Sequence, residues 1–334
     1  MNHLEDNKSI EKLTTLGVKA KTHKYCNIND IEHLYEILKS NSLPIKVLGG
    51  GSNILWTKDF NGLTIHINNK GISIEKETNS YVVVNIQAGE NWHEFVIWSI
   101  NNGYGGVENL ALIPGNVGAA PIQNIGAYGV EIKEVFIECS TIHLRSLKNK
   151  VFSAKDCQFG YRDSIFKNKE KNNYIITSIK LKLSKQGFHK LDLKYGDIKK
   201  LIDEGPVNPH KIANAVIKIR KSKLPDPNKL GNCGSFFKNP IINNSLFEKL
   251  VKKYPDIPNY PSGGKFKIPA AWLIEKLNYK GYRSGDAGVH KNQALILVNY
   301  GNSSGIEILN LSNKIKEDVF KVFKINLVTE VNVW

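Results

Sequence analysis

A single serine stands among glycines and phenylalanines in residues 231–240, which read GNCGSFFKNP. The flanking Gly231, Gly234, Asn239 and Pro240 are turn-forming residue types, so Ser235 could simply hydrogen-bond to nearby backbone. A hydroxyl held at a fixed position could instead deliver a proton to a reacting carbon atom. The segment alone leaves both interpretations open.

Two glycine-rich segments could hold a phosphate or a flat ligand. Residues 47–53, VLGGGSN, follow an apolar run, and consecutive glycines after a strand can turn backbone N–H groups toward phosphate oxygens. The spacing matches neither a Rossmann fingerprint nor a Walker A loop, so a plain tight turn is an alternative. Residues 108–132 combine small residues with amides, and Gln123 and Asn124 could satisfy the polar atoms of an isoalloxazine ring. A buried glycine-rich turn is the competing explanation for this segment.

An arginine lies between aromatic and apolar residues in residues 159–167, FGYRDSIFK. Arg162 and Asp163 could form a surface pair of little energetic consequence. A guanidinium beside Tyr161 is also well suited to bind a carboxylate or a diphosphate. The segment is therefore a candidate clamp for either anion.

The apolar pattern predicts the elements that position these segments. Asp30 is the expected N-cap of one helix, and Asn208 that of another with Pro209 at its first position. Further helices are predicted within residues 90–103, with Gly103 as the stop, and around residues 270–277. A long helix carries Ile308, Leu311, Ile315, Val319 and Val322 on its apolar stripe. Strands are predicted within residues 45–48, 81–89, 174–185, 293–299 and 325–334. Helices and strands mix without the alternation of a doubly wound sheet, which indicates the α+β class.

Composition narrows the function classes. The chain has 334 residues, of which 41% are hydrophobic and 23% charged, so we expect a globular protein of two or three domains. No apolar run is long enough to span a membrane, and Glu5, Asp6 and Glu11 are incompatible with a signal peptide, so we expect a cytoplasmic protein. The four cysteines lack CxxC or Cys/His spacing, which argues against disulfides and zinc.

The formal net charge of +15 would suit a nucleic-acid partner. However, the lysines are scattered among abundant Asn and Ile, and the sequence contains no pattern of an RNA- or DNA-binding module. We therefore favour acidic small molecules as ligands.

The motifs in order resemble the UDP-N-acetylenolpyruvoylglucosamine reductase family over nearly the whole chain. The matching segments are LGGGSN, AGENWHEFV, ENLALIPGNVGAAPIQNIGAYG, FGYRDSIFK, LKYGD, RKSKLPDP, GNCGSFFKNP, AGVHKNQALILVN and TEV. The LKYGD segment is similar to the type I subgroup, which has a tyrosine loop over the substrate. The resemblance implies non-covalent FAD, NADPH as co-substrate, and reduction of the enolpyruvyl ether of a UDP-sugar to UDP-N-acetylmuramate for peptidoglycan synthesis.

The resemblance also implies roles for individual residues. Ser235 would be the proton donor, Arg162 would pair with the substrate carboxylate, and Glu330 would hydrogen-bond to the developing enolic oxygen. The residues expected at the FAD pyrophosphate are Gly49, Gly50, Gly51, Ser52 and Asn53, and those expected along the flavin are Gln123, Asn124, Gly126, Ala127 and Gly129. The expected substrate contacts are Tyr195 as the lid, Lys223, Asn239, Gln293 and Tyr161.

The implied architecture is α+β with three domains, built from a vanillyl-alcohol-oxidase-type (PCMH-like) FAD module and an α+β substrate-binding domain. The expected FAD subdomains are residues 1–69 with 328–334 and residues 70–213, and the expected substrate domain is residues 214–327. We expect a monomer with two small-molecule substrates and no metal, nucleic-acid or membrane partner. Family members often have arginine where this chain has Asn332, and they usually continue beyond the position of Trp334, so the chain departs from the family pattern at its tail.

Two other functions remain open from the sequence. An oxidase of the vanillyl-alcohol type would share the flavin module, but such enzymes often attach the flavin to histidine, which neither glycine-rich segment contains. Acid precipitation would distinguish them, because a covalent flavin stays with the protein. A non-catalytic nucleotide- or RNA-binding protein would fit the charge, and it would be colourless and take up no FAD.

Overall fold

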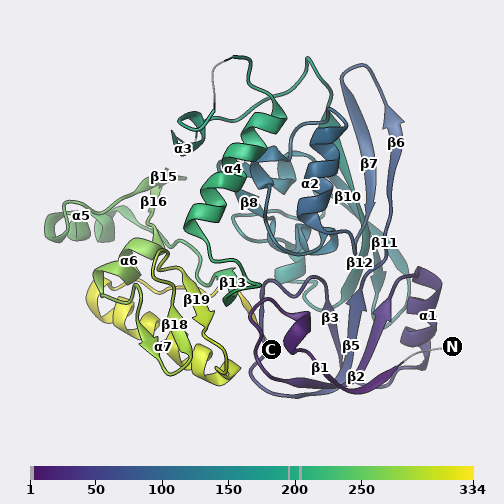
Figure 1. Ribbon diagram of the computed structural model, residues 1–334, viewed down its shortest axis with the longest axis horizontal. Helices are drawn as coiled ribbons and strands as arrows, with labels where there is room; N and C mark the ends of the chain where they lie inside the picture. The colour runs from purple at the N-terminus through teal and green to yellow at the C-terminus, as the bar shows by residue number, and fades with distance from the viewer. Residues whose placement is uncertain (1–3, 195, 203–204) are drawn as a thin grey trace. The chain divides into compact units, whose positions relative to one another are not determined.

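The computed structural model describes residues 4–194, 196–202 and 205–334. The chain forms two compact units, which are described separately (Figure 1). Unit 1 comprises Met1–Lys8, Thr22–Gly50 and Asn61–Ser222, and unit 2 comprises Ser9–Lys21, Gly51–Phe60 and Lys223–Trp334. The division into three domains with the boundaries given above stays a prediction. No helix in the described part of the chain is long and apolar enough to cross a membrane.

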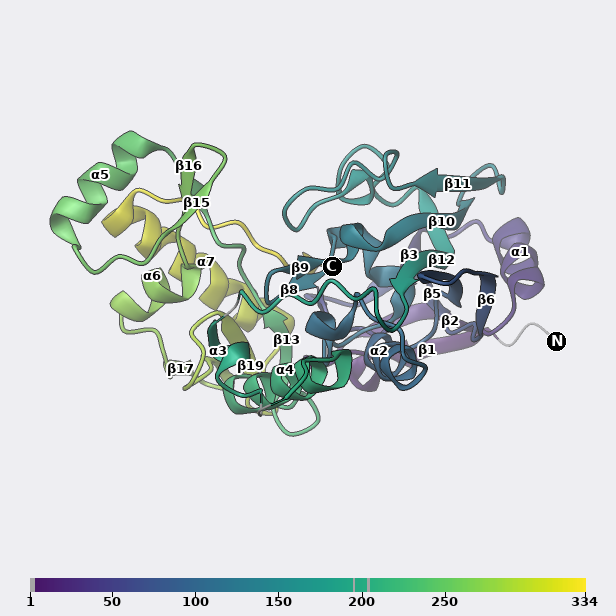
Figure 2. The same ribbon diagram turned by 90° about the horizontal axis from the view of Figure 1, so that it is seen from above.

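The larger sheet of unit 1 is antiparallel throughout. Its strand order is β11 (Asn149–Ser153), β10 (Phe136–His143), β12 (Tyr174–Ser184), β7 (Tyr81–Gln87) and β6 (Ile72–Glu77). The helices α2 (Trp92–Asn101) and α4 (Pro209–Lys223) lie on the same side of this sheet in both views (Figures 1 and 2). Apolar side chains of both helices pack with those of β7 and β12 into one buried core, which holds this part of unit 1 together.

The second sheet of unit 1 leads into the first glycine-rich loop. Its order is β1 (Glu5–Ser9), β2 (Lys21–Ile28), β5 (Phe60–Ile67) and β3 (Ile45–Leu48). Helix α1 (Ile31–Ser40) buries Leu34, Ile37 and Leu38 against this sheet. Strand β3 runs parallel to β5 and ends at Leu48, and the glycines of the first loop follow directly after it.

Residues 108–132, here called the 108–132 loop, form short irregular elements between α2 and β10. They are η2 (Glu108–Leu110), η3 (Val117–Ala119), η4 (Pro121–Gln123), β8 (Gly126–Ala127) and β9 (Val130–Glu131), and η5 (Ile132–Glu134) follows. Strands β8 and β9 form a small antiparallel hairpin with Tyr128 and Gly129 at its turn. The other short elements of unit 1 are η6 (Ile165–Lys167), between β11 and β12, and α3 (Gly196–Lys199), between β12 and α4.

Unit 2 is built on a four-stranded and a three-stranded sheet. The first has the order β13 (Gly231–Ser235), β19 (Ile296–Asn299), β18 (Ala287–Val289) and β17 (Arg283–Ser284), and the second has the order β14 (Ile241–Ile242), β16 (Lys265–Lys267) and β15 (Tyr260–Ser262). The helices are η1 (Glu11–Leu13), α5 (Asn244–Lys253), α6 (Ala270–Lys276) and α7 (Gly305–Phe323), and α7 contacts β18, β19 and α6. A separate parallel pair joins β4 (Ile54–Leu55) to β20 (Asn332–Val333).

Most predicted elements are confirmed, and their ends follow from capping. Asp30 caps α1 by accepting from the His33 N–H, and Asn208 accepts from the Lys211 N–H at 2.9 Å at the start of α4. The prediction of the apolar stripe of α7 was wrong at the end of the helix. Val322, which was predicted to be buried, is 39% exposed, and the next residue, Phe323, is buried instead, with 1% exposed. The predicted closing strand was also too long, because only Asn332–Val333 forms a strand there.

Candidate active site

Ser235 lies at the end of β13 with an exposed side chain. Its partner across the sheet is Ile296, and the register between β13 and β19 is irregular just before it. Gly234 has a φ of +72°, a backbone conformation that favours glycine, and it has open space around its Cβ position. Glycine is needed at position 231 for a different reason, because a Cβ there would lie 2.5 Å from the Leu16 carbonyl oxygen. The glycine turn at 234 therefore places the serine, and the glycine at 231 allows close packing.

Glu330 lies on the chain segment that pairs with the residues directly after Ser235. The Glu330 N–H donates to the Phe236 carbonyl at 2.9 Å, and the Lys238 N–H donates to the Val328 carbonyl at 2.9 Å. Glu330, which is half-buried, therefore lies opposite Phe236, the residue that directly follows the exposed Ser235. Two of the three predicted catalytic residues are thus neighbours within unit 2.

Asn53, from the first glycine-rich loop, joins the same group. Its side-chain amide donates to the Glu330 carbonyl at 3.5 Å. In turn, both the backbone N–H and the side-chain amide of Asn332 donate to the Asn53 carbonyl, each at 3.1 Å. Asn332 therefore anchors the glycine-rich loop to the segment that carries Glu330.

The predicted substrate contacts of unit 2 occupy different positions. Gln293 accepts from the Leu295 N–H through its side chain at 3.3 Å, next to the strand that pairs with Ser235. The Asn239 side chain accepts from the Ala270 N–H at 2.9 Å and so satisfies the first turn of α6. Lys223 is exposed at the last residue of α4. Tyr195 lies outside the described residues.

Within unit 1, the two glycine-rich segments approach each other closely. A Cβ on Gly50 would lie 2.8 Å from both the Gly115 Cα and the Asn116 Oδ1, whereas Gly49 has ordinary space. The Gly115 carbonyl accepts from the Trp92 N–H at 2.9 Å, which fixes it to the start of α2. The next two residues belong to unit 2, where Gly51 has a φ of +62° and is buried, and Ser52 is half-buried. Glycine is thus required at position 50 for the contact between the two segments.

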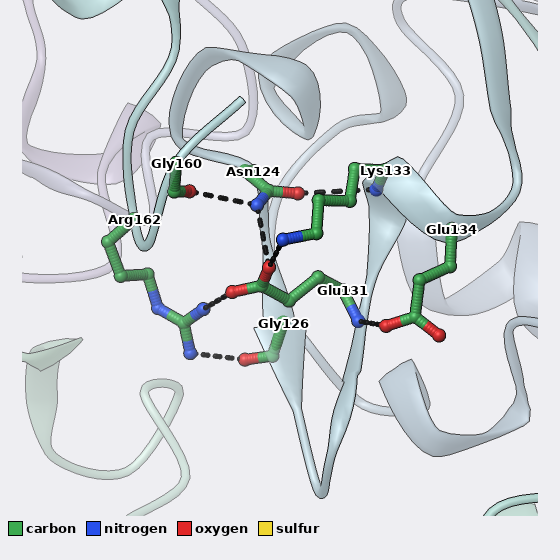
Figure 3. A network of polar contacts seen from close by, with 7 residues as sticks. All are labelled: Asn124, Gly126, Glu131, Lys133, Glu134, Gly160 and Arg162. Carbon is green, nitrogen blue, oxygen red and sulfur yellow. Dashed lines mark hydrogen bonds and ion pairs between the residues drawn. The ribbon is translucent and has the colours of Figure 1, made fainter. Parts of the chain in front are cut away.

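Asn124 organises the 108–132 loop from within (Figure 3). It is completely buried and has a φ of +46°. Its amide donates to the Glu131 carboxylate at 3.0 Å and to the Gly160 carbonyl at 2.9 Å, and its oxygen accepts from the Lys133 N–H at 3.2 Å. The side chain therefore joins β9 and the residues after it to the segment that carries Arg162.

Arg162 contacts the β8–β9 hairpin (Figure 3). Its guanidinium donates to the Gly126 carbonyl and lies 3.9 Å from the Glu131 carboxylate, with 20% of the side chain exposed. It also lies 5.4 Å from the centre of the Tyr161 ring. A Cβ on Gly126 would lie 2.9 Å from the Arg162 Nη1, so glycine is needed there for the contact. The hairpin holds the guanidinium, and part of the Arg162 side chain stays accessible.

The remaining predicted flavin contacts lie along the same loop. Gln123 and Ala127 are half-buried, and Gly129 has a φ of +90° at the hairpin turn. Beside this turn, a Cβ on Gly129 would lie 3.4 Å from the Asp192 carboxylate. Asp192 stands three residues before Tyr195, so the segment leading to the predicted lid passes along the hairpin turn.

Sequence reasoning gave no role to Asn109. It is 1% exposed, and its amide donates to the Tyr128 carbonyl at 3.0 Å and to the Asp192 carbonyl at 3.1 Å. The signal was an amide within an apolar run, ENLAL, which points to a buried and bonded side chain. Its partners are 19 and 83 residues away, so the sequence could not identify them.

Two family models match the chain. The C-terminal domain of UDP-N-acetylenolpyruvoylglucosamine reductase matches residues 226–334, and an FAD binding domain matches residues 25–142. The second range contains both glycine-rich segments and the β8–β9 hairpin. The first contains Ser235 and Glu330.

Curated relatives match the chain from end to end. The UDP-N-acetylenolpyruvoylglucosamine reductase of Flavobacterium johnsoniae is 51% identical, with 99% of each chain covered. The enzyme of the same name from Pseudomonas putida is 40% identical, over 98% of this chain and 97% of the relative.

Solved structures show the same fold at lower identity. The crystal structure of UDP-N-acetylenolpyruvylglucosamine reductase from Thermus caldophilus has a TM-score of 0.70 and 21% identity, with all of both chains covered. The structure of 6-hydroxy-D-nicotine oxidase from Arthrobacter nicotinovorans has a TM-score of 0.54 and 10% identity, over 98% of this chain and 87% of that one. The α+β class with a vanillyl-alcohol-oxidase-type FAD module is thereby confirmed.

Proposed function

This chain belongs to the UDP-N-acetylenolpyruvoylglucosamine reductase family, and from that membership we infer that Ser235, Arg162 and Glu330 carry its reaction. The enzyme uses FAD and NADPH to reduce the enolpyruvyl ether of a UDP-sugar to UDP-N-acetylmuramate, a precursor of peptidoglycan.

The residues of the two glycine-rich segments fit FAD. The β3–β4 connection supplies glycine backbone at the end of a strand, where N–H groups can bind a pyrophosphate, and Ser52 and Asn53 add side-chain donors. The 108–132 loop supplies half-buried Gln123, Gly126 and Ala127 for the flat ring system. Asn124, which is fully buried, acts on the flavin indirectly by holding this loop in shape.

When bound, FAD carries a hydride from NADPH to the terminal carbon of the enolpyruvyl group. Ser235 donates its hydroxyl proton to the neighbouring carbon, where the addition leaves negative charge. Arg162 binds the substrate carboxylate with its guanidinium as the negative charge on the carboxylate grows. Glu330 hydrogen-bonds to the developing enolic oxygen.

One observation supports this assignment most strongly. Ser235, Glu330 and Asn53 come from three segments that are far apart in the sequence, and backbone and side-chain bonds gather them in unit 2. A serine kept only as a turn residue would need no such neighbours. The group joins the predicted proton donor to a predicted residue of the pyrophosphate loop.

Anaerobic stopped-flow absorbance with both substrates tests the function. NADPH is expected to bleach the flavin absorbance, and the enolpyruvyl UDP-sugar is expected to restore it in the second half-reaction. A purified protein that contains no flavin and binds none, or whose reduced flavin persists when the UDP-sugar is added, would refute the proposal. The Tyr195→Ala variant is expected to weaken binding of the UDP-sugar more than binding of FAD, and unchanged affinity for the UDP-sugar would remove the lid role.

We further propose that the enzyme works as a cytoplasmic monomer, with no nucleic-acid or membrane partner. Both substrates are small molecules, and the reaction needs only one set of the residues named above. Size-exclusion chromatography with light scattering would give the mass of a single chain. A dimer mass, or retention of RNA through purification, would contradict this proposal.

A further inference from the structure

Arg162 lies in a tight turn with an unfavourable backbone conformation. Gly160 and Asp163 close the turn, because the Gly160 N–H donates to the Asp163 carbonyl at 3.0 Å and the Asp163 N–H donates to the Gly160 carbonyl at 3.2 Å. Arg162, within the turn, has a φ of +52°, a region that long side chains rarely adopt. Such a conformation persists only where the surrounding structure holds it.

Bonds on both sides of Arg162 attach this turn to the 108–132 loop. On one side, the Gly160 carbonyl accepts from the Asn124 amide at 2.9 Å (Figure 3). On the other side, the Ser164 hydroxyl donates to the Ile122 carbonyl at 2.6 Å. Ile122 lies in η4 and Asn124 directly after it, so both ends of the turn are attached to one short stretch of the loop.

The arginine side chain is attached to the same stretch. Its guanidinium donates to the carbonyl of Gly126, two residues after Asn124 (Figure 3). The backbone and the guanidinium of Arg162 are thus both held by residues 122–126. The position of the guanidinium relative to this stretch therefore depends on the bonds at the two ends of the turn.

The Ser164 hydroxyl is buried, and its hydrogen is already used. The residue is 1% exposed, and its hydrogen goes to the Ile122 carbonyl. Its oxygen accepts from the Phe166 N–H at 3.2 Å and so caps η6. A serine kept only as a cap would need the acceptor alone, so the bond to Ile122 is a second role. Because the hydroxyl has no free hydrogen to offer a ligand, it acts on the site through Arg162.

The residues that follow Ser164 are fixed in the core of unit 1. The Ile165 N–H donates to the Cys157 carbonyl at 2.8 Å, and both Ile165 and Phe166 are buried. The Phe166 ring packs edge-on against Phe152, with 5.0 Å between the ring centres. Ser164 therefore joins a rigid element to the turn, and its bond to Ile122 sets how the two meet the 108–132 loop.

Resting on the proposed role of Arg162, we propose that Ser164 is a positioning residue for carboxylate recognition, which holds the Arg162 guanidinium in place for the carboxylate of the UDP-sugar. Two parallel hydrogen bonds from a guanidinium to a carboxylate require a defined orientation. A small displacement of the binding group costs much of their effect. Loss of the Ser164 hydroxyl therefore weakens binding of UDP-sugars that carry a carboxylate, and has little effect on those without one.

Calorimetric titration of the oxidised holoenzyme measures this preference with two ligands. UDP-N-acetylmuramate carries the carboxylate, and UDP-N-acetylglucosamine lacks the group that bears it. In Ser164→Ala, we expect the affinity for UDP-N-acetylmuramate to fall about tenfold and that for UDP-N-acetylglucosamine to fall less than about twofold. An unchanged preference, or an equal loss for both ligands, overturns the proposal.

Ser99→Ala is the matched control for the loss of a buried serine. Ser99 is completely buried in unit 1, and its hydroxyl donates to the Tyr104 carbonyl at 3.3 Å. We expect this variant to keep the wild-type preference between the two UDP-sugars. A fall in preference equal to that of Ser164→Ala would show a general effect of stability and overturn the proposal.

A double-variant cycle tests whether Ser164 acts through Arg162. We expect Ser164→Ala to weaken binding of UDP-N-acetylmuramate in the wild-type background and to have no further effect in an Arg162→Gln background. An equal loss in both backgrounds overturns the proposal. If Ser164→Ala does not fold, Ser164→Cys replaces it, because a thiol is a weak donor of similar shape. A smaller loss of the same preference supports the proposal, and an unchanged preference overturns it.

Failure of the proposed function is recognised from other variants. Equal affinity of the wild type for the two UDP-sugars, or a preference that survives in Arg162→Gln, would refute the role of Arg162 and this inference with it. A preference that Arg162→Gln abolishes and Ser164→Ala leaves intact would refute the role of Ser164 alone.

Discussion

Replacing Asn124 by alanine should loosen the loop that holds Arg162. The side chain makes three hydrogen bonds from a fully buried position, to Glu131, Gly160 and Lys133. At a net contribution of about 0.5 to 1.5 kcal/mol for each bond, their loss costs about 2 to 4 kcal/mol. Alanine also lacks the tolerance of asparagine for positive φ, which adds about 1 kcal/mol.

Asn172→Ala separates these two terms. Asn172 has a φ of +60° and an exposed side chain, so its replacement carries the backbone cost without the loss of buried bonds. The difference between the two variants therefore isolates the hydrogen bonds of Asn124.

Native-state hydrogen exchange is the appropriate assay, because a chain of two units need not unfold in one step. The amides of Ile125 and Ile132, which bond to carbonyls within this region, report on its opening. Relative to Asn172→Ala, exchange in Asn124→Ala is expected to be faster by about 30-fold to 700-fold. Equal exchange in both variants would show that the amide bonds do not hold the loop.

Two more perturbations follow from the geometry. In denaturant unfolding, Gly51→Ala should lower the free energy of unfolding by at least about 2 kcal/mol more than Gly17→Ala. Both glycines have a positive φ, but only at Gly51 would a Cβ collide with its surroundings, 2.0 Å from the Leu13 carbonyl oxygen. Equal losses in the two variants would contradict this packing. Stability should fall as the pH drops below 6.5, because burial lowers the pKa of His66, His93 and His290 in the folded protein, so that the unfolded chain binds more protons in this range. A denaturation midpoint that stays constant or rises from pH 7 to pH 5 would refute the second expectation.

Local signals in the sequence were sufficient for most helices. Asp30 and Asn208 fix helix starts by accepting from N–H groups three residues further on, and Pro209 has a backbone φ that suits the first position of a helix, so no tertiary information was needed. The end of α7 needed such information. Val322 and Phe323 are both apolar and adjacent, and only the packing of Phe323 against Tyr254 and Trp272 determines which of them is buried.

The sequence was sufficient to predict which residues form the candidate site, but not how these residues are arranged in space. The resemblance pointed to Ser235 and Glu330, but the backbone bond that joins their segments spans 94 residues of sequence between Phe236 and Glu330. The assignment of Asn124 to the flavin surface shows the same limit, since an amide in a glycine-rich loop can serve the loop itself.

The central claim is that the Ser235 hydroxyl supplies the proton when the enolpyruvyl group is reduced. Anaerobic stopped-flow measurement of both half-reactions in Ser235→Ala tests it directly, with Ser245→Ala as a control at an exposed serine of the same unit. We expect flavin reduction by NADPH at nearly the wild-type rate, and reoxidation by the UDP-sugar slowed by orders of magnitude in Ser235→Ala alone. Reoxidation at the wild-type rate, or an equal loss in both half-reactions, would contradict the claim.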